Sequence, residues 1–198
     1  QWTQMFLCAK DQALTLQPPK ENGTLSFQAM GDGLSFVSAP LPNELELTGP
    51  LAAKLKVSSS TSDADLFLVL RVLTPDLREV TFAGAIDPHT PVAQGWLRAS
   101  HRALDNELTK PYRPYHTHTN PQPLIPGEAV EVEIELWPTS IVIPAGYRIA
   151  LSVRGRDYTY SEKTGLKLSN FKNELLGCGP FLHNDPRDRL GEIFKGET

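Results

Sequence analysis

Two histidines separated by one residue are the first side chains in this sequence that could do chemistry. His116 and His118 flank Thr117 in a proline-rich stretch, and a His-x-His pair on a strand can present both imidazoles to a zinc or copper ion. His101 and His89 could supply further ligands. A closed zinc site needs four ligands, however, and the local sequence suggests only two. We therefore expect no metal and no other cofactor, and interpret the pair as part of a packed loop whose imidazoles donate to backbone carbonyls.

Serine could act as a nucleophile only in a particular context. The strand-turn-helix elbow of serine hydrolases reads Gly-x-Ser-x-Gly, and the nearest fragment, Gly33-Leu34-Ser35, continues into Phe36-Val37 with no helical pattern after it. Ser152 stands on the outward face of an expected strand and is no better placed. Neither serine is predicted to be catalytic.

A pair of aspartates could hold calcium. Asp63 and Asp65 bracket Ala64 just before an apolar run, and Asp-x-Asp contributes to some calcium sites in loops. The glycine and the later glutamate of an EF-hand loop are missing. We expect the pair to cap the start of a strand.

A dense polar cluster from His183 to Arg189 combines histidine, aspartate and arginine. Adjacent positions cannot easily orient one another as a base and its partner, and no nucleophile accompanies them. We interpret the cluster as a salt-bridged turn, so no catalytic residue is predicted anywhere in the chain.

Aromatic side chains leave two interpretations open. The chain contains Trp2, Trp96, Trp137, Tyr112 and Tyr115, and tryptophan or tyrosine can stack on sugars in a β-sandwich that binds carbohydrate. The same side chains could instead line a core edge or a domain interface, where aromatics are enriched.

Composition narrows the class of protein. The 198 residues suit one domain and carry a net charge of -4 without a basic stripe, so a nucleic-acid partner is not expected. No apolar run is long enough to span a bilayer, and the N-terminus has no signal-peptide pattern. Two distant cysteines suggest no disulfide framework. We expect a soluble, cytoplasmic protein with no membrane partner.

The elements that must position these side chains are strands. Apolar residues alternate with glutamates over Val130–Leu136, and apolar residues over Tyr147–Val153 alternate with Arg148, Ala150, Ser152 and Arg154. We expect these two segments to pair, glutamate opposite arginine. Leu51–Val57 alternates with lysines, and Leu66–Leu73 is almost continuously apolar, as in a strand covered on both faces. Weaker strands are expected at Leu25–Gln28, Ser35–Val37, Leu45–Thr48, Val80–Ala83 and Gly95–Ala99.

Short strands separated by proline and glycine predict an all-β fold, an antiparallel sandwich or jelly roll. Only Leu168, Phe171 and Leu175 follow a helical spacing, which allows one short helix. The proline-rich segment Lys110–Pro126 should be a long ordered loop.

Several of these segments resemble one family. They are Glu46–Leu51 (ELTGPL), Asp63–Phe67 (DADLF), Gly95–Arg102 (GWLRASHR), Pro123–Glu128 (PLIPGE), Leu136–Thr139 (LWPT) and Pro144–Arg148 (PAGYR). In order and spacing, over residues 44–189, they resemble the C-terminal domain of X-Pro dipeptidyl-peptidases and of cocaine-esterase-like (CocE/NonD) acyl hydrolases. The resemblance implies a non-catalytic jelly-roll β-sandwich, similar to galactose-binding domains, that follows an α/β-hydrolase domain bearing a Ser-Asp-His triad.

The resemblance also implies a domain layout. Residues 1–43 would be the segment that leaves the hydrolase domain together with the first strands, with Trp2–Leu7 as its start, and residues 44–198 would be the jelly-roll domain, both within one globular unit. Family members usually continue past Gly177–His183 into a final apolar strand, whereas this chain has a polar tail.

The expected partner is therefore the hydrolase domain of the same polypeptide. The chain itself is expected to be inactive, to pack on that domain, and to shape its active-site entrance or homo-oligomer contacts. An aromatic, proline-stiffened surface gives contact area at little ordering cost. The residues expected on that surface are Trp96, Arg98, His101, Tyr112, Arg113, Tyr115, His116 and His118. A free-standing carbohydrate-binding module and an intrinsic esterase are the alternatives.

Overall fold

The computed structural model describes residues 2–84 and 89–160, and these residues form a β-sandwich. Within them nine strands follow one another with a single 3-10 turn, η1 (Ala99–His101). The strands are β1 (Phe6–Cys8), β2 (Ala13–Thr15), β3 (Leu34–Val37), β4 (Leu45–Val57), β5 (Asp65–Leu73), β6 (Glu79–Val80), β7 (Ala93–Arg98), β8 (Val130–Ile143) and β9 (Arg148–Arg154). The all-β fold class expected from the sequence is confirmed.

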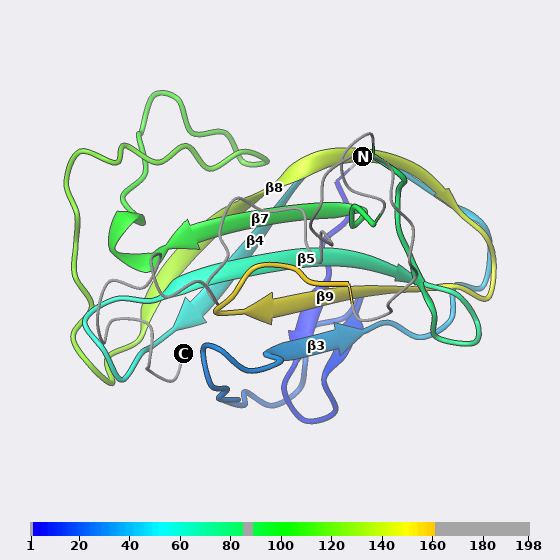
Figure 1. Cartoon of the computed structure of the whole chain (residues 1–198), viewed down its shortest axis with the longest axis horizontal. Helices are drawn as coiled ribbons and strands as arrows, with labels where there is room; N and C mark the ends of the chain where they lie inside the picture. The colour runs from blue at the N-terminus through cyan, green and yellow to red at the C-terminus, as the bar shows by residue number, and fades with distance from the viewer. Residues whose placement is uncertain (1, 85–88, 161–198) are drawn as a thin grey trace, which may run out of the picture.

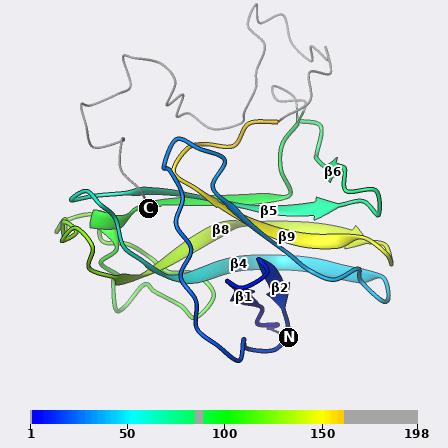
Figure 2. The same ribbon diagram turned by 90° about the horizontal axis from the view of Figure 1, so that it is seen from below.

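The strands divide between two sheets (Figure 1). The larger sheet has the order β1-β2-β3-β9-β5-β6, and β7 also pairs with β5. The second sheet is the long antiparallel pair β4–β8. Figure 2 shows the layers from the side, with β4 on the opposite side of the molecule from β5.

The core fills the space between the sheets because both contribute an apolar face. Leu66 and Leu68 of β5 face Val132 and Ile134 of β8, and all four are at most 1% exposed. The sheets approach so closely at Gly95 of β7 that an added Cβ would lie 1.9 Å from the carbonyl oxygen of Glu135. Only glycine fits there.

The expected pairing of the Val130–Leu136 and Tyr147–Val153 segments is wrong. β8 pairs with β4, placing Glu133 opposite Lys54, whereas β9 lies between β3 and β5. Alternation fixes which face of a strand is buried but not which strand lies beside it. The lysines of β4 and the arginines of β9 are both suitable partners for the glutamates of β8, so the sequence alone did not distinguish the two strands.

β4 and β8 are longer than the strands expected from the sequence, because their pairing continues on both sides of a bulge. The register passes from Gly49↔Thr139 to Leu51↔Leu136, so Pro50 opposes the two residues Trp137 and Pro138. The extra residue reverses the buried parity of β8, from even positions before the bulge to odd positions after it. The bulge also leaves Trp137 55% exposed.

The weaker strands have mixed outcomes. Ser35–Val37 and Gly95–Ala99 correspond to β3 and β7, and Leu45–Thr48 is the first part of β4. Val80–Ala83 is reduced to the end of β6 plus an isolated bridge between Phe82 and Thr90. Leu25–Gln28 is not a strand, although Leu25 and Phe27 pack against the core.

The helix expected at Leu168–Leu175 and the polar turn at His183–Arg189 lie outside the described residues. Across 2–84 and 89–160, no helix has the length and apolar character needed to cross a bilayer.

Candidate functional site

The loop between η1 and β8 is the longest ordered connection that the structure describes. Residues 103–126, hereafter the proline-rich loop, extend beyond the end of β7 (Figure 1). Its two arms pair at Leu104↔His116, and the amide of Asp105 donates to the carbonyl of Tyr115 at 2.8 Å. A tight turn between Lys110 and Arg113 closes its tip. The ordered loop expected at Lys110–Pro126 is confirmed.

The return arm of the loop is fixed to the sandwich. The amide of Gln122 donates to the carbonyl of Ser100 at 2.6 Å, and the amide of Leu124 donates to the carbonyl of Ser62 at 2.7 Å. Leu124 is 3% exposed and packs on Ala64 and Ala99. Contacts to both β5 and η1 therefore hold the loop in one position.

Asp63 joins the start of β5 to η1. Its Oδ1 accepts hydrogen bonds from the amides of Ala64 and Ser100, each at 2.9 Å. The capping role expected for Asp63 is confirmed, and it extends across two elements. Asp65 instead binds Arg98 through two hydrogen bonds, Nε to Oδ1 at 2.8 Å and Nη2 to Oδ2 at 2.9 Å. These two aspartates thus support the base of the proline-rich loop.

Three histidines meet where the loop leaves and rejoins the sandwich. Nδ1 of His101 and Nδ1 of His118 are hydrogen-bonded at 3.2 Å, and the rings of His116 and His118 have centroids 5.9 Å apart. Nε2 of His116 is buried without a hydrogen-bond partner. The expectation that the imidazoles of His116 and His118 donate to backbone carbonyls is wrong for His118, whose ring contacts that of His101 instead, whereas His116 interacts with the backbone of Glu133.

Charge around His116 favours its neutral form. Burial lowers the pKa of His116, and the imidazoles of His118 and His101 lower it further, while the backbone and carboxylate of Glu133 act in the opposite direction. Despite this gathering, no set of three or more His, Cys, Asp or Glu side chains in the described ranges is arranged to hold a metal ion.

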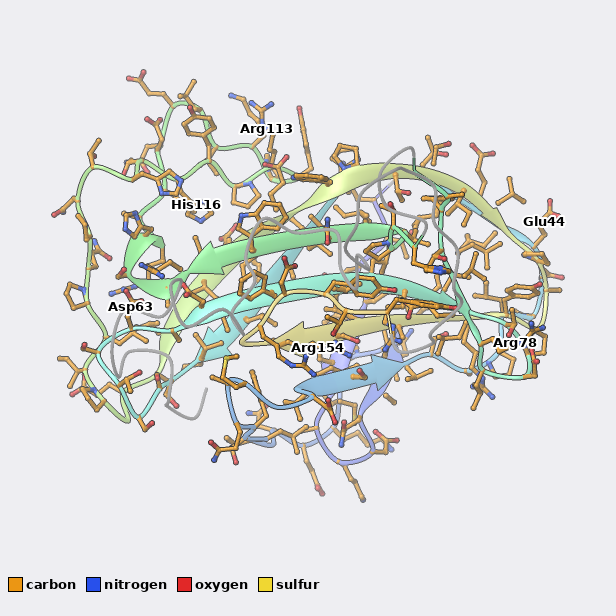
Figure 3. All side chains as sticks on the ribbon, viewed as in Figure 1. Glu44, Asp63, Arg78, Arg113, His116 and Arg154 are labelled. Atoms are coloured by element: carbon orange, nitrogen blue, oxygen red, sulfur yellow. The ribbon has the colours of Figure 1, made fainter. Side chains whose placement is uncertain are left out.

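Aromatic rings cover the outside of the loop and the neighbouring bulge. Trp2 stacks on Tyr112 with centroids 5.3 Å apart and planes 8° from parallel. Trp137 meets Trp96 edge to face at 5.2 Å. Both Trp2, at 62%, and Tyr115, at 44%, remain exposed. Figure 3 shows Arg113 at the outer end of the loop and His116 nearer to β7.

The expected surface residues therefore separate into groups. His101, His116 and His118 gather at the neck, and Tyr112, Arg113 and Tyr115 lie toward the tip. Arg98 is bound to Asp65, and Trp96 is linked to the bulge.

The two candidate serines are bound to each other. The hydroxyls of Ser35 and Ser152 lie 2.8 Å apart on neighbouring strands, and Ser152 is 1% exposed. Ser152 also faces the guanidinium of Arg71 at 3.5 Å. The outward face of β9 is thus buried here rather than open, and the serines form a structural cross-strand pair.

A buried ion pair on this same face was not foreseen. Nη2 of Arg71 binds Oε2 of Glu79 at 2.6 Å, and the Glu79 side chain is only 6% exposed. Arg154 lies nearby, and burial followed by repulsion from Arg71 and Arg156 lowers its pKa. The signal available in the sequence was the single arginine that interrupts the apolar run Leu66–Leu73.

Comparison with known proteins identifies the family. Residues 4–170 match the family model described as the X-Pro dipeptidyl-peptidase C-terminal non-catalytic domain. The chain belongs to this family. The matched range contains η1, the proline-rich loop and all eight of the expected surface residues.

Named relatives of this non-catalytic domain are hydrolases. A protein of Mycobacterium bovis named as a serine esterase is 34% identical over 132 residues, which cover 64% of this chain and 19% of that protein. A protein of Streptomyces avermitilis named as an Xaa-Pro dipeptidyl-peptidase is 30% identical over 140 residues, covering 62% of this chain and 21% of that protein. The chain therefore spans about a fifth of the length of these relatives.

A solved structure shares the arrangement of strands. The CocE/NonD family hydrolase of Staphylococcus aureus superposes with a TM-score of 0.74 at 28% identity, covering 83% of this chain and 30% of that one. The X-Pro dipeptidyl-peptidase C-terminal domain is thus a part of larger hydrolases, and the resemblance stated from the sequence motifs is confirmed.

Proposed function

We propose that this chain is the C-terminal domain of a serine α/β-hydrolase, of the dipeptidyl-peptidase or acyl-esterase type, and that it packs on the catalytic domain through the proline-rich loop. Residues 44–198 form the jelly-roll domain, and residues 1–43 lead into it from the catalytic domain and supply the first strands of the same globular unit. The surface formed by the loop and Trp96–Arg102 shapes the active-site entrance or the contacts of a homo-oligomer, in a cytoplasmic enzyme.

The stacking of Trp2 on Tyr112 is the observation that carries this proposal. It brings the first residues of the chain against the tip of the loop. A catalytic domain that precedes residue 1 would then end beside Tyr112, Arg113 and Tyr115. The proposal also draws support from the relatives, in which about four fifths of the protein lies outside the matched region.

Exposure and stiffness suit the loop to an interface. Leu108, Tyr115 and Ile125 are 46%, 44% and 59% exposed, and backbone hydrogen bonds already hold the two arms together. Aromatic and apolar side chains enriched at a prearranged surface give binding energy without a large ordering cost. Packing against the catalytic domain would cover them.

The test uses a full-length enzyme that contains this domain. Replacing Tyr112 and Tyr115 by alanine should lower the unfolding temperature of the catalytic domain or change KM across a series of substrates. The matched control is Val142→Ala, a residue 55% exposed on β8. An enzyme in which the tyrosine variant matches Val142→Ala in both measurements would contradict the proposal.

Exposed Trp137 supports a second candidate, a carbohydrate-binding module. Its ring is 55% exposed beside Trp96, and an exposed aromatic face can stack on a sugar. Screening the isolated chain on a glycan array separates the two candidates, because binding that is lost in Trp137→Ala would favour the module. The same preparation assayed on p-nitrophenyl esters tests the expectation that the chain itself is inactive.

A further inference from the structure

The neck of the proline-rich loop depends on histidine side chains that change charge near neutral pH. His101 ends η1, and His118 lies 17 residues later on the return arm, so their 3.2 Å contact spans the neck. His116 lies between them and the sandwich, with centroids 5.9 Å from His118. We propose that His101, His116 and His118 form a pH-sensitive clasp that holds the proline-rich loop closed at neutral pH and releases it in mild acid.

The contact between His101 and His118 tolerates only some protonation states. A hydrogen bond between two Nδ1 atoms needs one N–H and one bare nitrogen. When both rings are protonated, two N–H groups and two positive charges face each other at 3.2 Å. The contact then changes from attractive to repulsive, within the pH range where histidine titrates.

His116 adds to this sensitivity because burial disfavours its charged form more than the backbone and carboxylate of Glu133 favour it. Its Nε2 is buried without a hydrogen-bond partner. The pKa of His116 lies below its ordinary value because of this burial and because of the two neighbouring imidazoles. Protonation is thus easier when the loop opens and exposes the ring.

The other charged groups at the neck do not cancel the effect of protonating the histidines. Glu133 of β8 is the carboxylate that faces His116, and it is already bound to Lys54 of β4 at 2.5 Å. Arg102 donates to the carbonyls of Ala99 and Gln122 and so places a fixed positive charge at the neck. Acidification adds further positive charge beside it.

Backbone geometry indicates that the clasp is under tension. His118 has a φ of 54°, in the left-handed region that a non-glycine residue rarely adopts. The conformation is held by its surroundings, which include the contact with His101 and the bond from the amide of Thr117 to the carbonyl of Ala103. Once the rings repel each other, the contact that holds residue 118 in the left-handed conformation is lost.

The direction of the pH effect follows from the difference in proton binding between the closed and the open loop. Because the pKa of His116 is lowered in the closed loop, its ring is neutral in both the closed and the open loop above the ordinary histidine pKa, and pH has no influence through it there. As the pH falls below that ordinary pKa, the open loop binds more protons than the closed one, and opening becomes easier. The clasp is therefore intact above about pH 7 and weakens between about pH 6.5 and 5.

Hydrogen exchange of the 198-residue chain tests the clasp without any catalytic domain, so its outcome is independent of the proposed function. The reporters are the amides of Asp105, Thr117 and Gln122, which close the loop, and the amides of β5 serve as the reference. After correction for intrinsic exchange, we expect opening of the loop relative to β5 to rise several-fold from pH 7.5 to pH 5.5, because burial lowers the pKa of His116 in the closed loop. A ratio that stays constant would overturn the proposal.

Variants assign the effect to these rings. The double replacement His101→Asn and His118→Asn keeps polar side chains, and asparagine tolerates the left-handed backbone of residue 118; it should remove the pH response. His89→Asn, outside the clasp, should keep it. A response that survives in the double variant, or disappears in His89→Asn, would count against the clasp.

A second measurement covers the case in which the double variant does not fold. The imidazole signals of the unmodified chain can be followed by NMR as the pH falls. We expect the signals of His101, His116 and His118 to change together with the amides of the loop. Titration of the three rings with no change in the loop amides would exclude a clasp.

Discussion

The guanidinium of Arg98 and the carboxylate of Asp65 face each other across β7 and β5, joined by two nearly parallel hydrogen bonds of 2.8 and 2.9 Å. The hydrogen bonds to Asp65 raise the pKa of Arg98. Arg98 was expected at an interface, but this contact gives it a structural task beside the loop. β5 begins and β7 ends here, so the pair holds the edge from which η1 departs.

This bidentate contact should be measurable by a double-mutant cycle. We expect Arg98→Met and Asp65→Asn to couple by about 1 kcal/mol in the free energy of unfolding, because Arg98 is 42% exposed and solvent screens part of the attraction. Urea titrations of the two single variants, the double variant and the unmodified chain give the coupling. Strict additivity would show that the pair contributes nothing beyond its separate side chains.

Gly95→Ala should be among the most destabilising single methyl additions in the chain. The new Cβ would meet the backbone of Glu135 and Leu136, at 1.9 Å from the carbonyl oxygen of Glu135, and backbone cannot move aside as a side chain can. We expect a loss of about 3 kcal/mol or more. Thermal unfolding measures it.

Gly127→Ala is the matched control for that substitution. Gly127 has open space around it and a φ of 81°, so alanine there adds only the strain of a left-handed backbone, about 1 kcal/mol. Equal losses at the two glycines would mean that the sheets do not approach as closely at Gly95 as the structure has them.

The buried pair of Arg71 and Glu79 should be costly to break and easy to replace. Glu79→Gln removes the carboxylate that binds Arg71 and leaves Arg71 and Arg154 as neighbouring, partly buried cations, so we expect a loss of about 3 kcal/mol. The double change Arg71→Met and Glu79→Leu should restore most of it, because neither charge then needs compensation. A double variant as unstable as Glu79→Gln would contradict this. Chemical denaturation measures both.

The buried faces of β5 and β8 were predictable from the sequence, but the burial of both faces of β9 was not, and neither were the strand neighbours. The alternation over Val130–Leu136 and the apolar run Leu66–Leu73 determined which side chains are buried, and the structure agrees. Pairing depends on contacts between residues about 80 positions apart, such as Lys54 and Glu133, and no local pattern records them. The bulge at Trp137 was also hidden, since Pro138 looked like the end of a strand.

In the candidate site, too, local features were predictable from the sequence and long-range contacts were not. Motifs in the sequence located the proline-rich loop and its aromatic residues, because proline content and residue type are local properties. The contact of His101 with His118 and the stacking of Trp2 on Tyr112 depend on the path of the loop in space. Neither contact leaves a local pattern in the sequence, because each joins residues that are far apart along the chain.

Charge reversal at Glu133 tests the corrected pairing of β8. Lys54 and Glu133 are opposite in register and joined by an ion pair of 2.5 Å, and Lys54 is 73% exposed, so the pair is worth little in water. Glu133→Lys should cost about 0.5–1 kcal/mol of unfolding free energy, since two lysines would then face each other.

The compensating change decides which strand lies beside β8. Adding Lys54→Glu to Glu133→Lys restores opposite charges across β4 and β8, and we expect the unfolding free energy to recover. Adding Arg148→Glu in its place should bring no recovery, because β9 pairs with β3 and β5. The comparison is made at pH 8, where the neighbouring imidazole of His116 is neutral and a change at Glu133 does not act through it. Recovery with Arg148→Glu but not with Lys54→Glu would favour the pairing of β8 with β9 instead.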